Sequence, residues 1–210
     1  MTRRPAERDS KRQIFSAAAT EFAERGYEAA GVDRIADRAR VNKAMIYYHF
    51  ASKQGLYTEV LRDMFGAVGA RARALADGDA PAEQKLDAWI ETIVDEASQR
   101  PWFPPIMLRE LASGLVHMDP DTLSLLTAIY SGVRDIIVQG QQEGVFRDVD
   151  PLLTHLTIMP AVMAFFVRER VLAKPSKNSL AAARPLAAAR TRDEFLHHMQ
   201  HAVRGMLRRD

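Results

Sequence analysis

The chain contains no cysteine among its 210 residues. This absence excludes disulfide bonds, zinc sites built on thiolates and cysteine nucleophiles, and it fits a reducing compartment. Long apolar stretches are also lacking. The longest run, residues 158–167, has ten residues and includes Pro160, whereas a transmembrane helix needs roughly 20. The N-terminus, MTRRPAERDSKR, is too charged for a secretory signal peptide. We therefore expect a soluble, cytoplasmic protein without membrane contact.

The motifs of common enzyme classes are missing as well. The sequence has no phosphate-binding glycine loop, no Gly-x-Ser-x-Gly turn and no acid and base pair that can be assigned to one cleft. It also lacks alternating strand patterns and internal repeats. We therefore expect an all-α fold, no enzymatic activity and no cofactor.

Charge is distributed unevenly along the chain. The net charge is +2, yet residues 1–53 carry eleven Lys and Arg against seven Asp and Glu, whereas residues 54–210 carry eighteen against twenty. A basic N-terminal end on a slightly acidic body is expected when that end meets nucleic-acid phosphates. On charge alone, ordinary solvated helix faces explain the asymmetry equally well.

Residues 32–53, VDRIADRARVNKAMIYYHFASK, predict two short amphipathic helices separated by a tight turn. Apolar residues recur at i, i+3, i+4 and i+7 from Val32 to Ala39, which places them on one helix face. After the turn, Asn42 stands where a side-chain oxygen would cap the second helix. Two packed helices joined by about four residues form a helix-turn-helix, whose second helix can enter the major groove of DNA. This pattern predicts a DNA-binding protein.

Helical patterns cover most of the remaining chain. Ser10 and Gln13 suggest a capping box at the start of the first helix, with Gly26 as its stop, and Pro104-Pro105 precede a short helix. Including the two helices of the helix-turn-helix, we expect about nine helices. The other seven segments are 10–25, 52–77, 81–99, 106–112, 119–143, 150–172 and 191–209. Residues 174–190 predict a loop or linker with Ala-rich parts.

An ordered array of short motifs occupies residues 10–65. The motifs are Ile14-x-x-Ala17-Ala18-x-x-x-Phe22, Gly26-Tyr27, Val32-x-x-Ile35-Ala36, Val41-Asn42-Lys43, Ile46-Tyr47-Tyr48-His49-Phe50 and Lys53. In this order they resemble the TetR family of bacterial transcriptional regulators. Beyond residue 65 the similarity is architectural, with a Glu143-Gly144-Val145-Phe146 turn before a helix at Asp150-Pro151. The resemblance implies a three-helix DNA-binding domain at 1–53, a fourth helix from about residue 53 as the link, and a helical ligand-binding and dimerisation domain at 54–210.

Carried over by position, the resemblance implies one DNA-contacting surface around the turn and the second helix. Its residues are Arg40, Asn42, Lys43, Ala44, Met45, Tyr47, Tyr48, His49 and Lys53. The residues implied to face bases are Lys43, Ala44 and Met45. Those implied to reach the DNA backbone are Tyr47, His49 and Lys53, the last through its charge and the helix dipole together. Tyr48 touches either a base or the backbone, and Ile46 and Phe50 are implied to be core. As an alternative, the Tyr47 to His49 cluster simply fills the small N-terminal core.

Three positions depart from the family pattern. Ala30 and Gly31 replace a common Thr or Ser, so a hydroxyl that often touches a phosphate is missing. Arg40 replaces the usual glycine of the turn, where it either contacts DNA or is merely tolerated. Ala44 replaces a frequent Gly or Pro. These departures bear on individual contacts and leave the predicted fold unchanged.

Methionine and aromatic residues gather around proline-interrupted helices in the C-terminal part. The candidates for lining a ligand cavity are Trp89, Trp102, Phe103, Met107, Leu111, Tyr130, His155, Met159, Met163 and Phe166. Plain core packing is the alternative for each of them. The candidate polar groups are Arg109, His117 and His155, and Pro160 is expected to kink its helix and free a carbonyl. We expect a mostly apolar cavity bordered by Trp102-Phe103, with a hydrophobic or amphipathic inducer.

Two apolar stripes predict a homodimer joined by the helices at 150–172 and 191–209. The stripes consist of Leu152, Leu156, Met159, Met163 and Phe166, and of Phe195, Met199, Val203 and Met206. On the last helix His197 and His201 share a face with Glu194, a spacing that also occurs in metal sites. The catalytic Glu of a His-Glu-x-x-His motif is absent and a dimer seam explains the helix better, so we expect no metal.

These observations predict a homodimeric repressor. Its partners would be double-stranded operator DNA, a small apolar inducer and a second copy of the chain. A two-fold dimer sets two recognition helices about 34–36 Å apart, one turn of DNA. One alternative is an all-helical small-molecule-binding or catalytic protein without operator specificity. Another is a structural DNA-coating protein, against which the near-neutral body argues.

Overall fold

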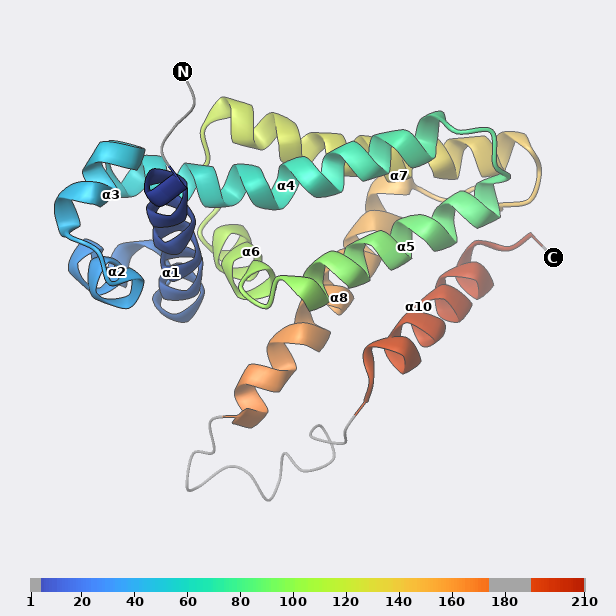
Figure 1. Ribbon diagram of the computed structural model, residues 1–210. Coiled ribbons are helices and arrows are strands. Elements are labelled where there is room, and N and C mark those ends of the chain that lie inside the picture. Colours follow the sequence, from blue (N-terminus) through green and yellow to red (C-terminus); the bar gives the residue numbers. More distant parts are fainter. Residues whose placement is uncertain (1–4, 174–189, 210) are drawn as a thin grey trace.

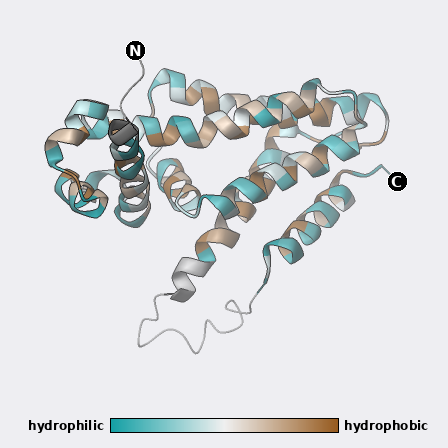
Figure 2. Cartoon of the chain, viewed as in Figure 1, coloured by the Kyte–Doolittle hydropathy of each residue, from teal (hydrophilic) through white to brown (hydrophobic). Residues whose placement is uncertain are grey.

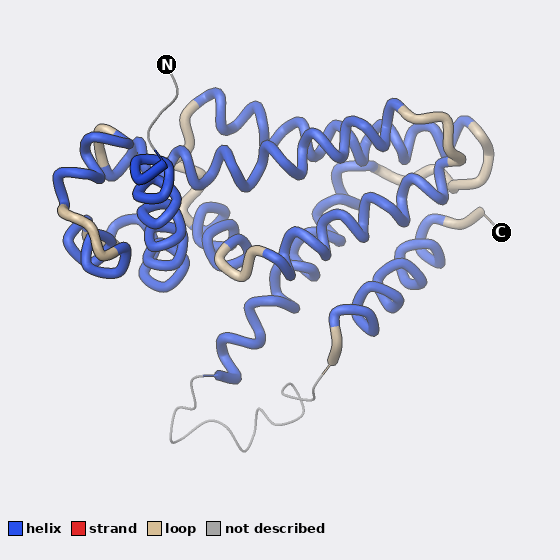
Figure 3. The backbone as a smooth tube through the Cα atoms, viewed as in Figure 1, coloured by secondary structure: helices blue, strands red, loops and turns tan. Residues whose placement is uncertain are grey.

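The computed structural model describes residues 5–173 and 190–209, and these residues form nine helices and connecting loops (Figure 3). The helices are, in chain order, α1 (Pro5–Ala29), α2 (Val32–Ala39), α3 (Lys43–Phe50), α4 (Lys53–Asp77), α5 (Ala82–Gln99), α6 (Phe103–Ala112), α7 (Pro120–Gln142), α8 (Pro151–Ala173) and α10 (Arg192–Leu207). Strand pairing within the described residues is limited to an isolated β-bridge between Phe146 and Arg208. The all-α prediction is confirmed. The predicted loop at 174–190 lies, except for its last residue, outside the described residues.

Helices α1 to α3 form a group at one end of the molecule, and the long α4 leads from this group into the body (Figure 1). There α4 lies alongside α7. Their approach is close, because a Cβ on Gly132 would lie only 2.8 Å from the Cβ of Ala72. Helix α8 packs against α5, α6 and α7, whereas α10 packs against α5. Within the body, α4 itself packs against α5 and α7.

Two predicted helix starts were wrong. Helix α1 begins at Pro5, so Ser10 lies inside it and caps nothing; its hydroxyl lies 2.9 Å from Nε2 of His49 on α3. Helix α6 begins at Phe103 and takes Pro104 and Pro105 into its first turn. Proline is tolerated there because the first N–H groups of a helix have no intrahelical acceptor.

The helices are amphipathic, with hydrophobic and hydrophilic residues interleaved along each ribbon (Figure 2). Their apolar faces meet in one core, in which Phe22, Phe65 and Trp89 are fully buried. Helix α8 is the exception, because it leaves three leucines about half exposed or more: Leu152, Leu153 and Leu156. An unpartnered apolar stripe remains on this helix.

Helix α8 is also more apolar than the sequence analysis allowed. Its window Pro151–Arg168 has a mean hydropathy of 1.4, and in length and composition it could cross a membrane. The expectation that the chain has no segment of this kind was therefore wrong, because leucines before residue 158 extend the short apolar run. The same length and composition also occur in packed helices of soluble proteins.

Candidate DNA-binding surface and ligand pocket

The turn between α2 and α3 is built by two local devices. Arg40 ends α2 in the left-handed region (φ 56°, ψ 42°), which explains why glycine suits this position. Asn42 begins α3, and its side-chain oxygen accepts a hydrogen bond of 2.8 Å from the N–H of Ala44. The predicted cap is confirmed. Gly31 precedes α2 without a side-chain cap, in keeping with the missing hydroxyl.

Helix α3 presents one face to solvent and one to the core. Tyr47 and Tyr48 are 47% and 67% exposed, and Lys43 and Ala44 beside them are exposed too. Ile46 and Phe50 are buried, as predicted. Two candidates for DNA contact, Met45 and His49, are half-buried, so part of each side chain packs inside the domain. An exposed pair of phenols next to a lysine can donate to phosphates and reach base edges.

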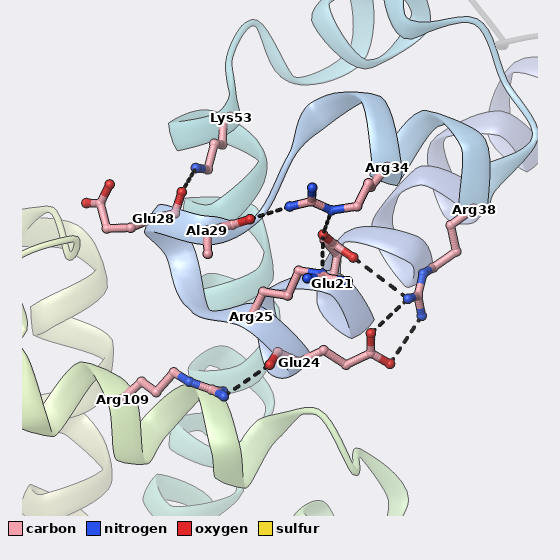
Figure 4. Close-up of polar contacts among 9 residues, drawn as sticks. All are labelled: Glu21, Glu24, Arg25, Glu28, Ala29, Arg34, Arg38, Lys53 and Arg109. Atoms are coloured by element: carbon pink, nitrogen blue, oxygen red, sulfur yellow. Dashed lines mark hydrogen bonds and ion pairs between the residues drawn. The ribbon is translucent and has the colours of Figure 1, made fainter.

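Both lysines of this surface have partners within their own domain. The Lys43 ammonium lies 2.7 Å from a carboxylate oxygen of Asp33, and this hydrogen bond raises the pKa of Lys43. Lys53, at the start of α4, donates to the carbonyl of Glu28 at 3.1 Å and lies over the ring of Tyr27 (Figure 4 draws the Glu28 contact). An ammonium has three N–H donors, so each lysine keeps donors for a phosphate.

A buried carboxylate fixes α2 against α1, a feature that the sequence analysis missed. Glu21 is 1% exposed, and three arginines converge on it in Figure 4: Arg25, Arg34 and Arg38. Burial alone would raise the pKa of Glu21, but the hydrogen bond and charge of Arg34 outweigh it and lower the pKa. The signal was present in the sequence, since Glu21 interrupts the apolar face of α1.

A second polar cluster joins the DNA-binding end to α6. Arg109 donates to the carbonyls of Ala23 and Glu24 in α1, at 2.6 and 3.2 Å (Figure 4 shows the Glu24 contact). The next residue, Glu110, is buried and accepts a hydrogen bond of 2.6 Å from the hydroxyl of Tyr57 on α4. Gly26 interrupts the helical conformation of α1 (φ 76°, ψ 172°), so the carbonyls just before it behave like those of a helix C-terminus, where a cation is favourable because they lack partners. Helix α6 is thereby tied to both α1 and α4.

An apolar cavity of about 270 Å³ lies among α4, α6, α7 and α8. Its lining residues are Phe65, Phe103, Met107, Leu111, Leu126, Thr127, Ile129, Tyr130, Leu152, His155, Leu156, Met159, Pro160 and Met163. Seven of the ten candidates from the sequence are among them: Phe103, Met107, Leu111, Tyr130, His155, Met159 and Met163. Helix α8, which runs on through Pro160, contributes a large share of the wall.

Three candidates do not line this cavity. Trp102 packs edge-on against Phe15 of α1, with ring centroids 6.1 Å apart, so the pocket is bordered by Phe103 and not by both residues. Trp89 is fully buried behind His155, and Phe166 packs against Phe165 and Phe195. Arg109 and His117, considered as polar groups for a ligand, belong to the junction with the DNA-binding end, where His117 lies 2.9 Å from Glu110.

The histidines of α10 are exposed and stand apart from the pocket. Glu194 is engaged at the start of this helix, where it and Thr191 form a reciprocal capping box. Across the part of the chain that the structure describes, no group of three or more His, Asp or Glu side chains is arranged to hold a metal ion.

A capped recognition helix with exposed tyrosines, tied to a helical body that contains an apolar pocket, defines a helix-turn-helix DNA-binding regulator. The family of bacterial regulatory proteins of the tetR type matches residues 14–60, and the tetracyclin repressor-like C-terminal domain matches residues 82–203. The chain belongs to the TetR family, and it is a DNA-binding transcriptional regulator.

Several known proteins are similar to this chain. The chain is 33% identical over 155 residues to the transcriptional repressor NicS of Pseudomonas putida, covering 73% of each chain. It is 40% identical over 89 residues to the transcriptional activator FasR of Mycolicibacterium smegmatis, covering 42% of this chain and 41% of the relative. The fold matches that of the ketosteroid transcriptional regulator KstR2 of Mycobacterium tuberculosis with a TM-score of 0.73 at 22% identity, over 100% of this chain and 98% of the other.

Proposed function

We propose that this protein is a homodimeric repressor that binds operator DNA through α3 and releases it when a small apolar molecule fills the pocket. One observation carries the proposal: the ten-residue helix α6 contains both residues that line the pocket and residues that bond to the DNA-binding end and to α4. Phe103, Met107 and Leu111 line the cavity, whereas Arg109 and Glu110 bond to α1 and α4. A ligand that displaces α6 therefore acts directly on the DNA-binding end.

Release follows from the geometry of a dimer. Recognition helices must lie about one DNA turn apart to bind together. A ligand shifts this spacing only to the extent that it binds the released state more tightly than the DNA-bound state. Helix α4, which begins at Lys53 beside α3 and lines the pocket with Phe65, is the lever. This assignment keeps residues 1–53 as the DNA-binding domain and 54–210 as the ligand-binding and dimerisation domain.

The dimer is proposed to form through α8 and α10. Of the stripe expected on α8, Leu152 and Leu156 are exposed, and with Leu153 beside them they form an apolar surface that a second copy would bury. Met163 of that stripe is only 1% exposed and lines the pocket instead. On α10, Phe195 and Met206 are half-buried beside the core residues Met199 and Val203. Paired with their mates, the two helices would make a four-helix bundle. Burial of α8 in this bundle also accounts for its high hydropathy without a membrane.

The DNA-contacting residues are proposed to be those of the turn and α3, with Lys43 and Tyr48 toward the bases and Tyr47 and Lys53 on the backbone. The relative NicS is a repressor, which supports the repressor assignment for this chain. A cytoplasmic location and the absence of enzymatic activity complete the proposal, in keeping with relatives that are transcriptional regulators.

The test is selection of DNA from a random pool with the purified full chain, followed by fluorescence anisotropy against the selected and a shuffled sequence. We expect a pseudo-palindromic site, because a two-fold dimer reads two half-sites. The variant Tyr48→Ala should lose selectivity, and Val138→Ala, at an exposed residue of α7, serves as control. Equal affinity for selected and shuffled DNA would favour a DNA-coating protein, and no DNA binding at all would favour the helical small-molecule protein.

A further inference from the structure

Among the described residues of the pocket wall there is one histidine, His155, and one of its ring nitrogens lacks a hydrogen-bond partner. His155 lies between Trp89 and Tyr130, with ring centroids 5.8 and 5.6 Å away. Its Nδ1 is buried and has no hydrogen-bond partner among the described residues, and the indole N–H of Trp89 behind it is unpartnered in the same sense. Buried polar groups normally have partners, because leaving them unpaired carries the full cost of desolvation.

Burial lowers the pKa of His155 to about 4. The ring is therefore neutral near pH 7, and a neutral imidazole offers one donor and one acceptor. Either a hydroxyl or a neutral carbonyl of a ligand can pair with it. The described residues of the wall that carry a hydroxyl are Thr127 and Tyr130, and Thr127 already donates to the carbonyl of Leu123 at 2.9 Å.

Among the residues that the structure describes, no Asp, Glu, Lys or Arg lines the wall. None of the described arginines of α4, α6, α7 and α8 is among the lining residues. Arg109 is directed to α1 and Arg134 pairs with Asp135, whereas Arg168 lies over the ring of Phe165 with its buried Nε unpartnered. A carboxylate in this pocket would lose its hydration without gaining a cation, which is strongly unfavourable.

We propose that the pocket takes an uncharged, largely apolar molecule whose hydrogen-bonding oxygen pairs with the imidazole of His155. The inference rests on the proposed role of this pocket as the inducer site, and it narrows the inducer to neutral alcohols, phenols or ketones. At about 270 Å³ the cavity lies near the lower end of ligand sites, which commonly span roughly 300–1,000 Å³. Compact ring compounds fit this size better than long acyl chains.

The test compares three compounds of nearly equal size by isothermal titration calorimetry of the full chain at pH 7.5, without DNA. The compounds are 2-naphthol, naphthalene and 2-naphthoate. We expect 2-naphthol to bind about tenfold more tightly than naphthalene, the size of effect that one hydrogen bond gives. Because it is charged, 2-naphthoate should bind most weakly. Equal affinities, tightest binding of 2-naphthoate or no binding of any compound would overturn the proposal.

The role of the ring is tested by substitution. In His155→Phe the tenfold preference for 2-naphthol over naphthalene should fall below twofold, and His155→Gln, which keeps a neutral hydrogen-bonding group, should restore part of it. His198→Phe, at an exposed histidine of α10 outside the pocket, should keep the full preference. A preference that survives His155→Phe would refute the assignment.

The hydrogen bond to His155 can also be tested by nuclear magnetic resonance on the protein without substitutions. In protein labelled with ¹⁵N-histidine, 2-naphthol should shift the ring nitrogen resonances of His155, and naphthalene should leave them nearly unchanged. Equal shifts with both compounds would count against the hydrogen bond. Release of operator DNA is measured separately. A compound that binds through His155 but releases no DNA would refute the inducer proposal and leave this inference standing.

Discussion

The hydroxyl of Tyr57 donates a hydrogen bond of 2.6 Å to Oε1 of Glu110, and both side chains are only 2% exposed. Burial, together with the hydrogen bond to Glu110, raises the pKa of Tyr57 far above its usual range, so the phenol stays protonated. His117 approaches the same carboxylate oxygen at 2.9 Å. The hydrogen bond between Tyr57 and Glu110 therefore joins α4, which leads away from the DNA-binding end, to α6, which lines the pocket.

Tyr57→Phe should lower the free energy of unfolding by about 2 kcal/mol, because it removes a buried hydrogen bond to a charged acceptor. Urea denaturation followed by circular dichroism measures this. The double variant with Glu110→Gln should cost less than the sum of the two single variants, since both remove the same contact. Strict additivity would show that the two side chains are energetically independent.

Arg109→Ala should weaken operator binding about threefold to tenfold, because α1 loses the two hydrogen bonds that hold it against α6. Fluorescence anisotropy with the selected operator measures the change. Arg134→Ala is the matched control, since that guanidinium pairs with Asp135 on the exposed side of α7. If the two variants bind the operator with equal affinity, the contact of Arg109 with α1 does not affect DNA binding, and the proposed coupling of the pocket to the DNA-binding end through α6 is wrong.

Lys53→Ala should weaken binding to operator and random DNA by a similar factor, because a phosphate contact carries no base information. The slope of log affinity against log salt should shrink by about one unit. Affinity measured between 50 and 300 mM salt gives this slope. An unchanged slope would mean that Lys53 acts only through its bond to the carbonyl of Glu28.

Leu153→Glu should convert the dimer into a monomer, because it places a charge among the exposed leucines of α8, between Leu152 and Leu156. Analytical ultracentrifugation at micromolar concentration measures the mass, and circular dichroism checks that the helices persist. Val116→Glu, at a side chain that is 70% exposed and outside α8, should remain dimeric. A monomeric parent protein would contradict the proposed dimer altogether.

Stability should depend on the ionisation of His155. Its folded pKa of about 4 lies below the unfolded value of 6.5, so the unfolded chain binds more protons between these values. The contribution of the neutral ring is present above pH 6.5 and is lost as the pH falls toward 4. At pH 5 the parent protein should have lost about 2 kcal/mol more than His155→Phe, relative to pH 7.5. Urea denaturation at both pH values measures the difference, and equal losses would place His155 in contact with solvent.

Features governed by local chain chemistry were predictable from the sequence. The helix-turn-helix follows from residue spacing and from Asn42, whose cap needs only its own backbone neighbourhood. The division of α3 into a core face and an exposed face follows in the same way, because helical periodicity fixes which residues share a side. Ser10 shows where such local prediction fails. Serine is a common helix cap, but α1 begins five residues earlier, and the hydroxyl of Ser10 contacts His49 of α3 instead.

The sequence by itself determined the all-helical fold, the recognition helix and an apolar body, because these depend on periodicity and short-range capping. Only the tertiary structure decided which side chains meet. Trp102 and Phe103 are neighbours in the chain, yet one packs on Phe15 and the other lines the pocket. Consecutive residues of a helical turn point about 100° apart, so their surroundings depend on how the helices pack. The Glu21 cluster and the Tyr57–Glu110 bond arise for the same reason, since each joins helices whose contact no local pattern specifies.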